Sequence, residues 1–161
     1  MSRIAGQPDR SVASVLNEED TVATLFTRII NGDLPGRFVW RDEASVGFLS
    51  INPLQPGHTL VVPRAEVDHW LDLEPALASH LMTVAQSIGR AVQQAFAPTK
   101  VGLMIAGLEV PHVHLHVVPI NGLGDLDFAR ADTHASPAAL DRAAEQIRGA
   151  LRTLGFAHVA A

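Results

Sequence analysis

Hydrophobic and polar residues alternate along the chain in short runs, and two different periods can be read from them. Five runs have the period of two and the β-branched or aromatic content that predict strands. Turn-forming residues separate most of these runs, so we expect short connections and a mainly antiparallel five-stranded sheet. The runs are residues 37–42, 44–51, 58–63, 100–107 and 112–119.

Three further stretches place apolar residues three and four positions apart, which is the spacing of an amphipathic helix. A capping serine followed by proline marks the start of the last stretch, and a proline ends the middle one. Helices packed on an antiparallel sheet predict an α+β fold. The first stretch contains Val22, Leu25, Phe26 and Ile29, the second covers residues 74–97, and the third runs from Ser136 to Leu154.

The size and composition of the chain suit one domain with a substantial hydrophobic core. The sequence has 161 residues, of which 47% are hydrophobic. Its N-terminal part is polar and mixed in charge. We therefore expect a mobile extension at residues 1–20, followed by a single domain at residues 21–161.

Charge and cysteine content narrow the classes of partner and chemistry. The formal net charge is −5 and Lys100 is the single lysine, so the chain has no basic stripe to hold a nucleic-acid backbone. The absence of cysteine excludes disulfides, a thiol nucleophile and a thiolate zinc site. No apolar run resembles a signal segment or is long enough to span a bilayer, so we expect a cytoplasmic protein without a membrane partner.

The run HVHLHVVP at residues 112–119 contains the greatest concentration of reactive side chains. Side chains on a strand alternate between its faces, so His112, His114 and His116 would share one face and the aliphatic residues between them the other. The aliphatic face is expected to pack in the core. The imidazoles, roughly 6.6 Å apart along the strand, are close enough to form one site.

Two kinds of chemistry fit such a cluster. Neutral imidazole is a nucleophile near pH 7, and repulsion keeps at least one ring neutral while a neighbour can be a cationic donor. One histidine could then attack phosphorus while the others stabilise charge on the phosphoryl oxygens and the leaving group. Alternatively, histidines two apart on a strand can share a zinc ion, and a bound water would be the nucleophile.

The run HVHLHVV resembles the signature of the histidine triad (HIT) superfamily of nucleotide hydrolases and transferases, in which three histidines alternate with apolar residues. The likeness covers about residues 24–120. LFTRIINGDLP resembles the opening helix of the family, and VGFLSINPLQPGHTLVVPR resembles its strand, turn and strand with a fourth histidine. This resemblance implies a HIT-like fold, a small nucleotide substrate and a homodimer.

The resemblance also implies roles for individual residues. The central histidine of the signature is the nucleophile of the family and corresponds to His114. The last one, His116, would donate to a phosphoryl or bridging oxygen, and His112 and His58 would orient the other rings. The positions that match the substrate pocket of the family are Leu25, Phe26, Ile29, Phe48, Ser50, Leu60, Glu109 and Val110.

Some of these positions have another interpretation or depart from the family's pattern. Leu25, Ile29 and Leu60 could equally be plain core residues. Ser50 stands where the family commonly has an aspartate that binds the ribose hydroxyls, and a hydroxyl binds them less strongly. Glu109 would repel a phosphate unless it is protonated, paired with a histidinium or directed at a cationic leaving group; otherwise it is a solvated residue.

We therefore predict a nucleotide phosphoryl-bond hydrolase or nucleotidyl transferase that forms a nucleotidyl-histidine intermediate. The substrate would be a small purine nucleotide conjugate of the phosphoramidate or dinucleoside-polyphosphate type. This chemistry requires no cofactor, although zinc could bind adventitiously to the histidine face. The alternatives are a metal-binding or nucleotide-binding module without turnover.

Overall fold

A computed structural model describes residues 22–161, and they form the predicted α+β fold. Five strands make one sheet in the order β1-β2-β3-β5-β4, in which every neighbouring pair is antiparallel. The N-terminal extension expected at residues 1–20 lies outside the described residues. The strands are β1 (Phe38–Arg41), β2 (Ser45–Leu49), β3 (Thr59–Pro63), β4 (Lys100–Met104) and β5 (Leu115–Ile120).

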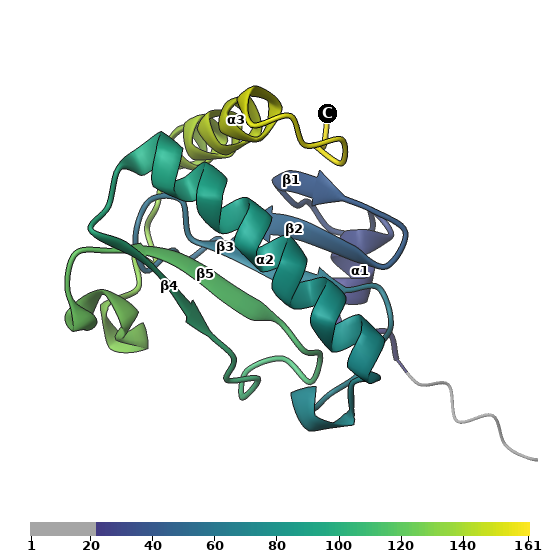
Figure 1. The fold of residues 1–161 in the computed structure, drawn as a ribbon. Coiled ribbons are helices and arrows are strands. Elements are labelled where there is room, and N and C mark those ends of the chain that lie inside the picture. Colours follow the sequence, from purple (N-terminus) through teal and green to yellow (C-terminus); the bar gives the residue numbers. More distant parts are fainter. Residues whose placement is uncertain (1–21) are drawn as a thin grey trace, which may run out of the picture.

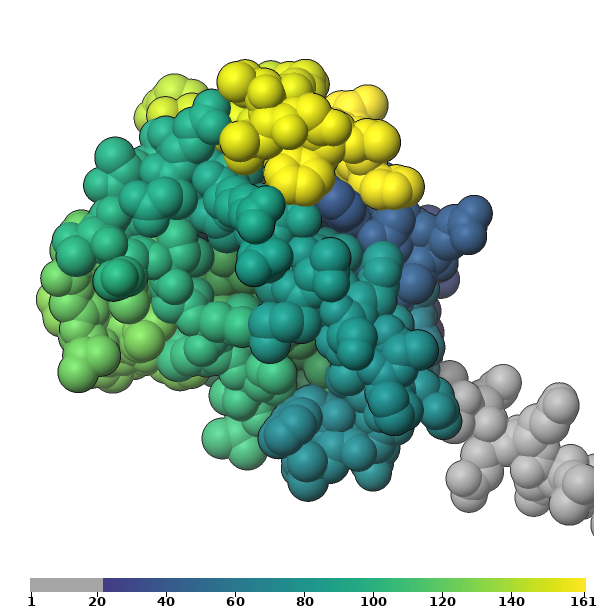
Figure 2. All heavy atoms as spheres, viewed as in Figure 1, coloured from purple at the N-terminus to yellow at the C-terminus, as the bar shows by residue number. Residues whose placement is uncertain are grey.

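The α-helices pack on both faces of this sheet (Figure 1). Helix α2 (Pro75–Phe96) crosses one face with α3 (Pro137–Thr153) beside it, and α1 (Leu25–Ile30) lies on the other face. In the space-filling view of Figure 2, α2 and α3 are in front and α1 is almost hidden behind the sheet. The short helix α1 thus leaves part of its face of the sheet open for a ligand.

Local sequence signals determine where the helices begin and end. The side chain of Thr24 caps α1 by accepting the backbone N–H of Thr27. Ser136 caps α3 in the same way, as its position before a proline predicts. Ala97 adopts a left-handed conformation at the end of α2, directly before Pro98, which cannot continue a helix. These observations confirm the predicted ends of the long helices.

Two clusters of buried apolar side chains lie on opposite faces of the sheet. The larger cluster lies under α2 and α3 and includes Val113, Leu115 and Val117, the aliphatic residues of the histidine run. The smaller cluster lies under α1 and includes Phe26 and Leu60. The alternation in the histidine run therefore sends its aliphatic side chains toward the two long helices and its imidazoles toward α1.

Some bounds of the predicted elements are wrong. The run at residues 100–107 is a strand only over Lys100–Met104. Val22 was expected in the first helical stripe, but Thr24 caps the helix after it, and Val22 is 90% exposed. The histidine run was expected to be a strand throughout, but β5 begins only at Leu115, so that His112 and His114 precede it. These two residues are held by side-chain hydrogen bonds instead of a full strand ladder.

Some connections contain short elements that the periodicity did not predict. Two 3₁₀ helices lie in the Gly- and Asp-rich segment after β5. The 3₁₀ helices are Trp70–Asp72, Leu123–Leu126 and Phe128–Arg130.

No helix in residues 22–161 combines the length and apolar character needed to cross a membrane.

Candidate active site

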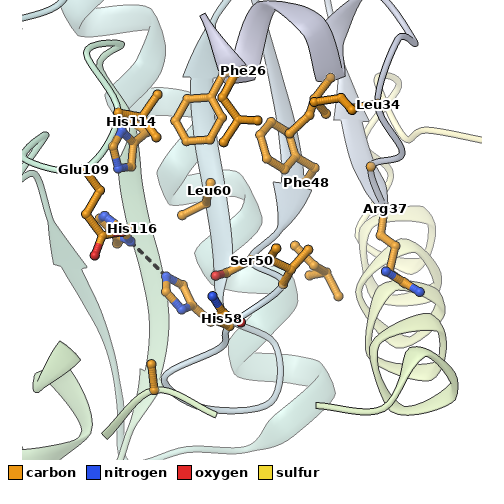
Figure 3. A pocket seen from close by; sticks show the side chains of 18 of the residues that line it. Phe26, Leu34, Arg37, Phe48, Ser50, His58, Leu60, Glu109, His114 and His116 are labelled. Carbon is orange, nitrogen blue, oxygen red and sulfur yellow. Dashed lines mark hydrogen bonds between the residues drawn. The ribbon is translucent and has the colours of Figure 1, made fainter. Parts of the chain in front are cut away.

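A pocket of about 490 Å³ lies between α1 and the strands β2, β3 and β5. This volume is within the range of small-molecule binding sites. Figure 3 shows imidazoles on one side of the pocket and Phe26, Phe48 and Leu34 on another. The pocket therefore has a polar end, which can carry chemistry, and an apolar end, which can hold a flat ring.

The fold brings together almost all of the residues predicted for the site. They come from α1, β2, β3, the turn before β3, and the segment around the start of β5. His112 is the exception, since it lies outside the pocket lining. The predicted residues that line the pocket are Leu25, Phe26, Ile29, Phe48, Ser50, His58, Leu60, Glu109, Val110, His114 and His116.

Aromatic side chains that pack edge to face build the apolar end. The ring centroids of Phe26 and Phe48 are 5.6 Å apart, and Phe38 lies 5.6 Å from Phe48. Leu60 belongs to the buried cluster under α1 and also lines the pocket, so it is both a core residue and a pocket residue. Leu25 is 47% exposed and is therefore not a core residue.

The protonation of His114 follows from one hydrogen bond. Its Nδ1 lies 2.7 Å from the backbone carbonyl oxygen of His112. A carbonyl oxygen only accepts hydrogen bonds, so Nδ1 carries the proton of the neutral ring and Nε2 keeps a free lone pair. Phe26 packs edge-on against this imidazole, with centroids 4.9 Å apart, and restricts its orientation. His114 can therefore act as a nucleophile through Nε2.

The same reasoning assigns the protons of His58 and His116. The backbone N–H of Leu54 donates to Nδ1 of His58 over 3.0 Å, so the proton of a neutral His58 lies on Nε2. That Nε2 lies 2.9 Å from Nδ1 of His116, which must therefore accept. The remaining proton of His116 lies on Nε2, which can donate to a ligand in the pocket (Figure 3).

Burial lowers the pKa of the pocket imidazoles, because a charged ring loses its hydration there. Together with repulsion from neighbouring imidazoles, burial lowers the pKa of His58 to about 3 and the pKa of His116 to about 4. The pKa of His114 is lowered as well, mainly by burial. All three rings are neutral at pH 7. The cationic donor expected from the sequence therefore requires a nearby negative charge, such as a bound phosphate.

His112 shares its sheet face with the pocket but is fully buried behind it. Its Nε2 lies 2.8 Å from the carbonyl oxygen of Pro63, and its Nδ1 lies 2.7 Å from Oγ1 of Thr24. Its ring also packs against Phe26, with centroids 5.8 Å apart. Because both nitrogens are engaged and the ring is outside the pocket, His112 can act on a ligand only indirectly.

The two positions that depart from the HIT pattern both line the pocket. The half-buried side chain of Ser50 lies between the apolar end and His58 (Figure 3). Glu109 is exposed at the rim on the histidine side (Figure 3). Its negative charge favours a higher pKa for His114, although the effect of burial is larger. Glu109 therefore lies where a group bound beside the imidazoles would meet it.

Two connections supply most of the pocket residues that the sequence did not reveal. One joins α1 to β1, and the other is the segment after β5, which contributes Phe128. The ring of Phe128 packs edge-on against His116, with centroids 5.1 Å apart, and is 42% exposed. The sequence did contain one indication of this contact, since Phe128 is an aromatic residue in an otherwise polar segment. The missed residues are Leu34, Pro35, Gly36, Arg37, Leu49, Ile51, Asn52, Phe128, Ala131 and Thr133.

Metal ligation was the main chemical rival to nucleophilic attack. Within residues 22–161, no group of three or more histidine, cysteine, aspartate or glutamate side chains is arranged to hold a metal ion. Two nitrogens of the pocket histidines are also committed to each other, since His58 donates to His116. The hydrogen bond between these two rings leaves fewer imidazole nitrogens open to a metal ion than the spacing in the sequence indicates.

Comparison with known proteins agrees with this geometry. The profile of the HIT domain matches residues 31–122, which is more than half of the chain. The chain belongs to the HIT family. It is 34% identical over 116 residues to the Hit protein of Bacillus subtilis, and the match covers 69% of this chain and 80% of that protein.

A solved structure and an enzyme are among the other HIT relatives. The crystal structure of a zinc-bound histidine triad protein from Mycobacterium smegmatis matches with a TM-score of 0.71 and 29% identity, and covers 82% of this chain and 95% of that one. The bifunctional bis(5'-adenosyl)-triphosphatase/adenylylsulfatase FHIT of Arabidopsis thaliana is 33% identical, over 58% of this chain and 54% of that protein. Some relatives are thus nucleotide hydrolases.

Proposed function

We propose that this HIT protein is a nucleotide phosphoryl-bond hydrolase or nucleotidyl transferase in which His114 is the nucleophile. The observation that carries the proposal is the hydrogen bond from His114 Nδ1 to the backbone carbonyl of His112, because it leaves the Nε2 lone pair free on the pocket side. The neighbouring apolar end, with Phe26 and Phe48, suits a nucleobase.

In the first step, Nε2 of His114 attacks the α-phosphorus, and the bond from phosphorus to the leaving group breaks. The anionic phosphate favours an additional proton on the hydrogen-bonded pair His58 and His116. That proton passes from His116 to the departing atom, which leaves with the bonding electron pair. Water then attacks phosphorus, His116 takes its proton, and the mononucleotide separates from His114.

The arrangement of the pocket supports a nucleotide conjugate as the substrate. The base would lie between the aromatic rings of the apolar end, and the ribose would lie beside Ser50. The α-phosphate would then be next to His114 and His116. The leaving group would meet Glu109 and Phe128, which border the histidine side. We propose a purine conjugate of the phosphoramidate or dinucleoside-polyphosphate type, and Ser50, Glu109 and Phe128 as the residues that adjust its selection.

A substrate panel tests this proposal. Adenosine and guanosine phosphoramidates, dinucleoside polyphosphates and nucleotide sulfates would be assayed for release of mononucleotide, with His114→Ala protein as the control. We expect one class to be turned over, and rapid quenching should trap a nucleotide covalently attached to wild-type protein. Tight binding of mononucleotide without turnover of any conjugate would instead support a nucleotide-binding module.

A second comparison tests the metal-dependent alternative. Because imidazole itself attacks phosphorus in the proposed mechanism, turnover should continue after treatment with a chelator. The measurement is the initial rate with and without chelator, on protein purified without an affinity tag and analysed for metal content. Loss of the rate on chelation and its recovery with zinc would support a metal-bound water as the nucleophile.

We also propose that the protein is a homodimer that pairs through β4 and α2. Strand β4 is at the edge of the sheet and carries Leu103, which is 42% exposed, while Met82 of α2 is 51% exposed beside the same groove. A strand edge with exposed apolar side chains favours association. Light scattering should give twice the chain mass for the wild type, and Leu103→Glu should shift the mass toward that of the monomer.

A further inference from the structure

The buried ring of His112 has no direct access to the pocket, yet both of its nitrogens have defined partners. Nε2 lies 2.8 Å from the carbonyl oxygen of Pro63, which only accepts, so this nitrogen carries the proton. Nδ1 of the neutral ring is then an acceptor. The Thr24 hydroxyl, 2.7 Å away, must donate to it. The side chain of Thr24 therefore fixes the ring of His112 from the side of α1.

Thr24 is itself held by several other contacts, among them the hydrogen bond from the Arg28 N–H to its carbonyl oxygen. Its Oγ1 accepts the backbone N–H of Thr27 over 3.1 Å as the cap of α1, and lies 3.2 Å from Oγ1 of Thr27. Its backbone N–H donates to Oε1 of Glu66 over 2.9 Å. The Thr27 hydroxyl and then the Thr24 N–H lower the pKa of Glu66 and keep this carboxylate charged. The start of α1 is thus tied to the segment that follows β3.

The position of His112 matters because its backbone holds the candidate nucleophile. The carbonyl oxygen of His112 accepts the Nδ1 proton of His114 over 2.7 Å. Residues 112–114 precede β5, so they lack the regular ladder that fixes the carbonyl groups of a strand. The orientation of this carbonyl group therefore depends on the contacts of the His112 ring, together with the bond from the Val113 N–H to the Val67 carbonyl.

We propose that Thr24 is a positioning residue for His114, acting through His112, and that Glu66 keeps Thr24 in place. The series of contacts runs from Glu66 to Thr24, to the ring of His112, and through its carbonyl group to His114. This inference rests on the proposed function, in which Nε2 of His114 attacks phosphorus. Thr24 itself does not line the pocket.

Three variants separate this role from a general effect on folding. Thr24→Val removes the hydroxyl at nearly constant volume, and Thr24→Ser retains it. Ser136→Ala is the matched control, since it removes the hydroxyl cap of α3, which is not in contact with the histidines. Misplacing a reactive group by about 1 Å can cost roughly a hundredfold in rate, so we expect Thr24→Val to lower kcat by about tenfold to a hundredfold.

The pattern of kinetic changes is specific to positioning. KM should stay within a few-fold in Thr24→Val because Thr24 does not line the pocket and every side chain that does is retained. Thr24→Ser keeps the hydroxyl and should restore most of kcat. Ser136→Ala should lower stability without lowering kcat. If Thr24→Val does not fold, Glu66→Ala provides the second variant, and a smaller loss of kcat is expected there. A wild-type kcat in Thr24→Val, or in Glu66→Ala where it is needed, contradicts the proposal.

A spectroscopic measurement tests the same contacts without turnover. In protein labelled with ¹⁵N at histidine, the shifts of His114 report which ring nitrogen carries the proton. We expect the Nδ1-protonated form in wild type, Thr24→Ser and Ser136→Ala, and a changed signal in Thr24→Val or Glu66→Ala. Unchanged shifts would overturn the positioning role. If wild-type protein turns over no conjugate but these shifts respond as expected, the proposed function fails while the structural connection to His114 stands.

Discussion

At His114, one hydrogen bond to a backbone carbonyl determines which nitrogen can react. The resemblance to the HIT signature singles out the central ring, but the sequence contains no information on the tautomer. That information comes from the 2.7 Å contact with the His112 carbonyl, and for His116 from the chain of contacts through His58. The chemistry of the site thus depends on the two nitrogens of each ring having different partners.

Removal of the His114 imidazole tests its role directly. His114→Ala should abolish turnover but keep mononucleotide affinity within a few-fold, because the apolar walls, including Phe48 and Leu60, remain. The measurements are the steady-state rate and the Kd from calorimetry, and His69→Ala, at an exposed position outside the pocket, is the control. A variant that retains a near wild-type rate would exclude His114 as the nucleophile.

Ser50 allows a test of ribose recognition at a single side chain. A charged acceptor binds a hydroxyl more strongly than a neutral one, so Ser50→Asp should tighten ribonucleotide binding by roughly 1 kcal/mol. The gain should vanish with a 2′,3′-dideoxy nucleotide, which lacks both hydroxyls. An equal gain for the ribo and dideoxy ligands, measured by calorimetry, would indicate that Ser50 does not contact the ribose.

Glu109 should affect the leaving group more than the nucleotide. If its carboxylate faces the departing group, Glu109→Gln should change the rate ratio between conjugates with cationic and neutral leaving groups. Affinity for the bare mononucleotide should change much less. The ratio of the two kcat/KM values is the quantity to measure, and an unchanged ratio would identify Glu109 as a solvated rim residue.

At the scale of the elements, periodicity predicted the strands and long helices but not everything that surrounds the pocket. The alternation in residues 112–119 correctly separated the imidazoles from the larger apolar cluster, since Val113 and Leu115 are buried under α2. It could not reveal that β5 begins at Leu115, because strand ends depend on pairing with β3 and β4. Similarly, Phe128 reaches His116 only through the folding of the whole segment after β5.

That segment can be tested through Phe128. Asp132 and Pro53 are joined by a backbone hydrogen bond of 3.0 Å, which helps to hold the segment against the turn before β3. An edge-to-face aromatic contact contributes about 0.5–1.5 kcal/mol, so Phe128→Ala should lower kcat/KM by about twofold to tenfold. Phe156→Ala removes a comparable contact with Trp40 on the other face and serves as the control. Equal effects of both variants on kcat/KM would argue against a role for Phe128 at the site.

At the scale of the whole molecule, the larger part of the hydrophobic core and the candidate active site lie on opposite faces of the sheet. The larger apolar cluster packs under the two long helices on one face, whereas the imidazoles and the smaller cluster occupy the other. The strand order β1-β2-β3-β5-β4 makes this possible, because it places β5 beside β3 and so brings His116 to His58. Local sequence patterns do not determine such an order, because it depends on which strands pair in the folded chain.

Burial of uncharged imidazoles on the pocket face also predicts how stability depends on pH. The folded-state pKa of His58 is about 3 and that of His116 about 4, both below the value of 6.5 for an unperturbed histidine. Between these values the unfolded chain binds more protons than the folded one. The stabilising contribution of the neutral rings is therefore fully present above pH 6.5 and decreases as the pH falls toward 4, by at most about 1.4 kcal/mol per pH unit for each ring.

Urea denaturation between pH 7.5 and 4.5 measures this dependence. The free energy of unfolding of the wild type should fall with pH below about 6.5, and His116→Asn, which removes one of the buried titrating rings, should reduce the slope. Leu60→Ala is the matched control on the same face, because it should lower stability by a similar amount at every pH. Parallel curves for wild type and His116→Asn would mean that His116 contributes no pH dependence, and hence that its ring is not held neutral by burial in the folded protein.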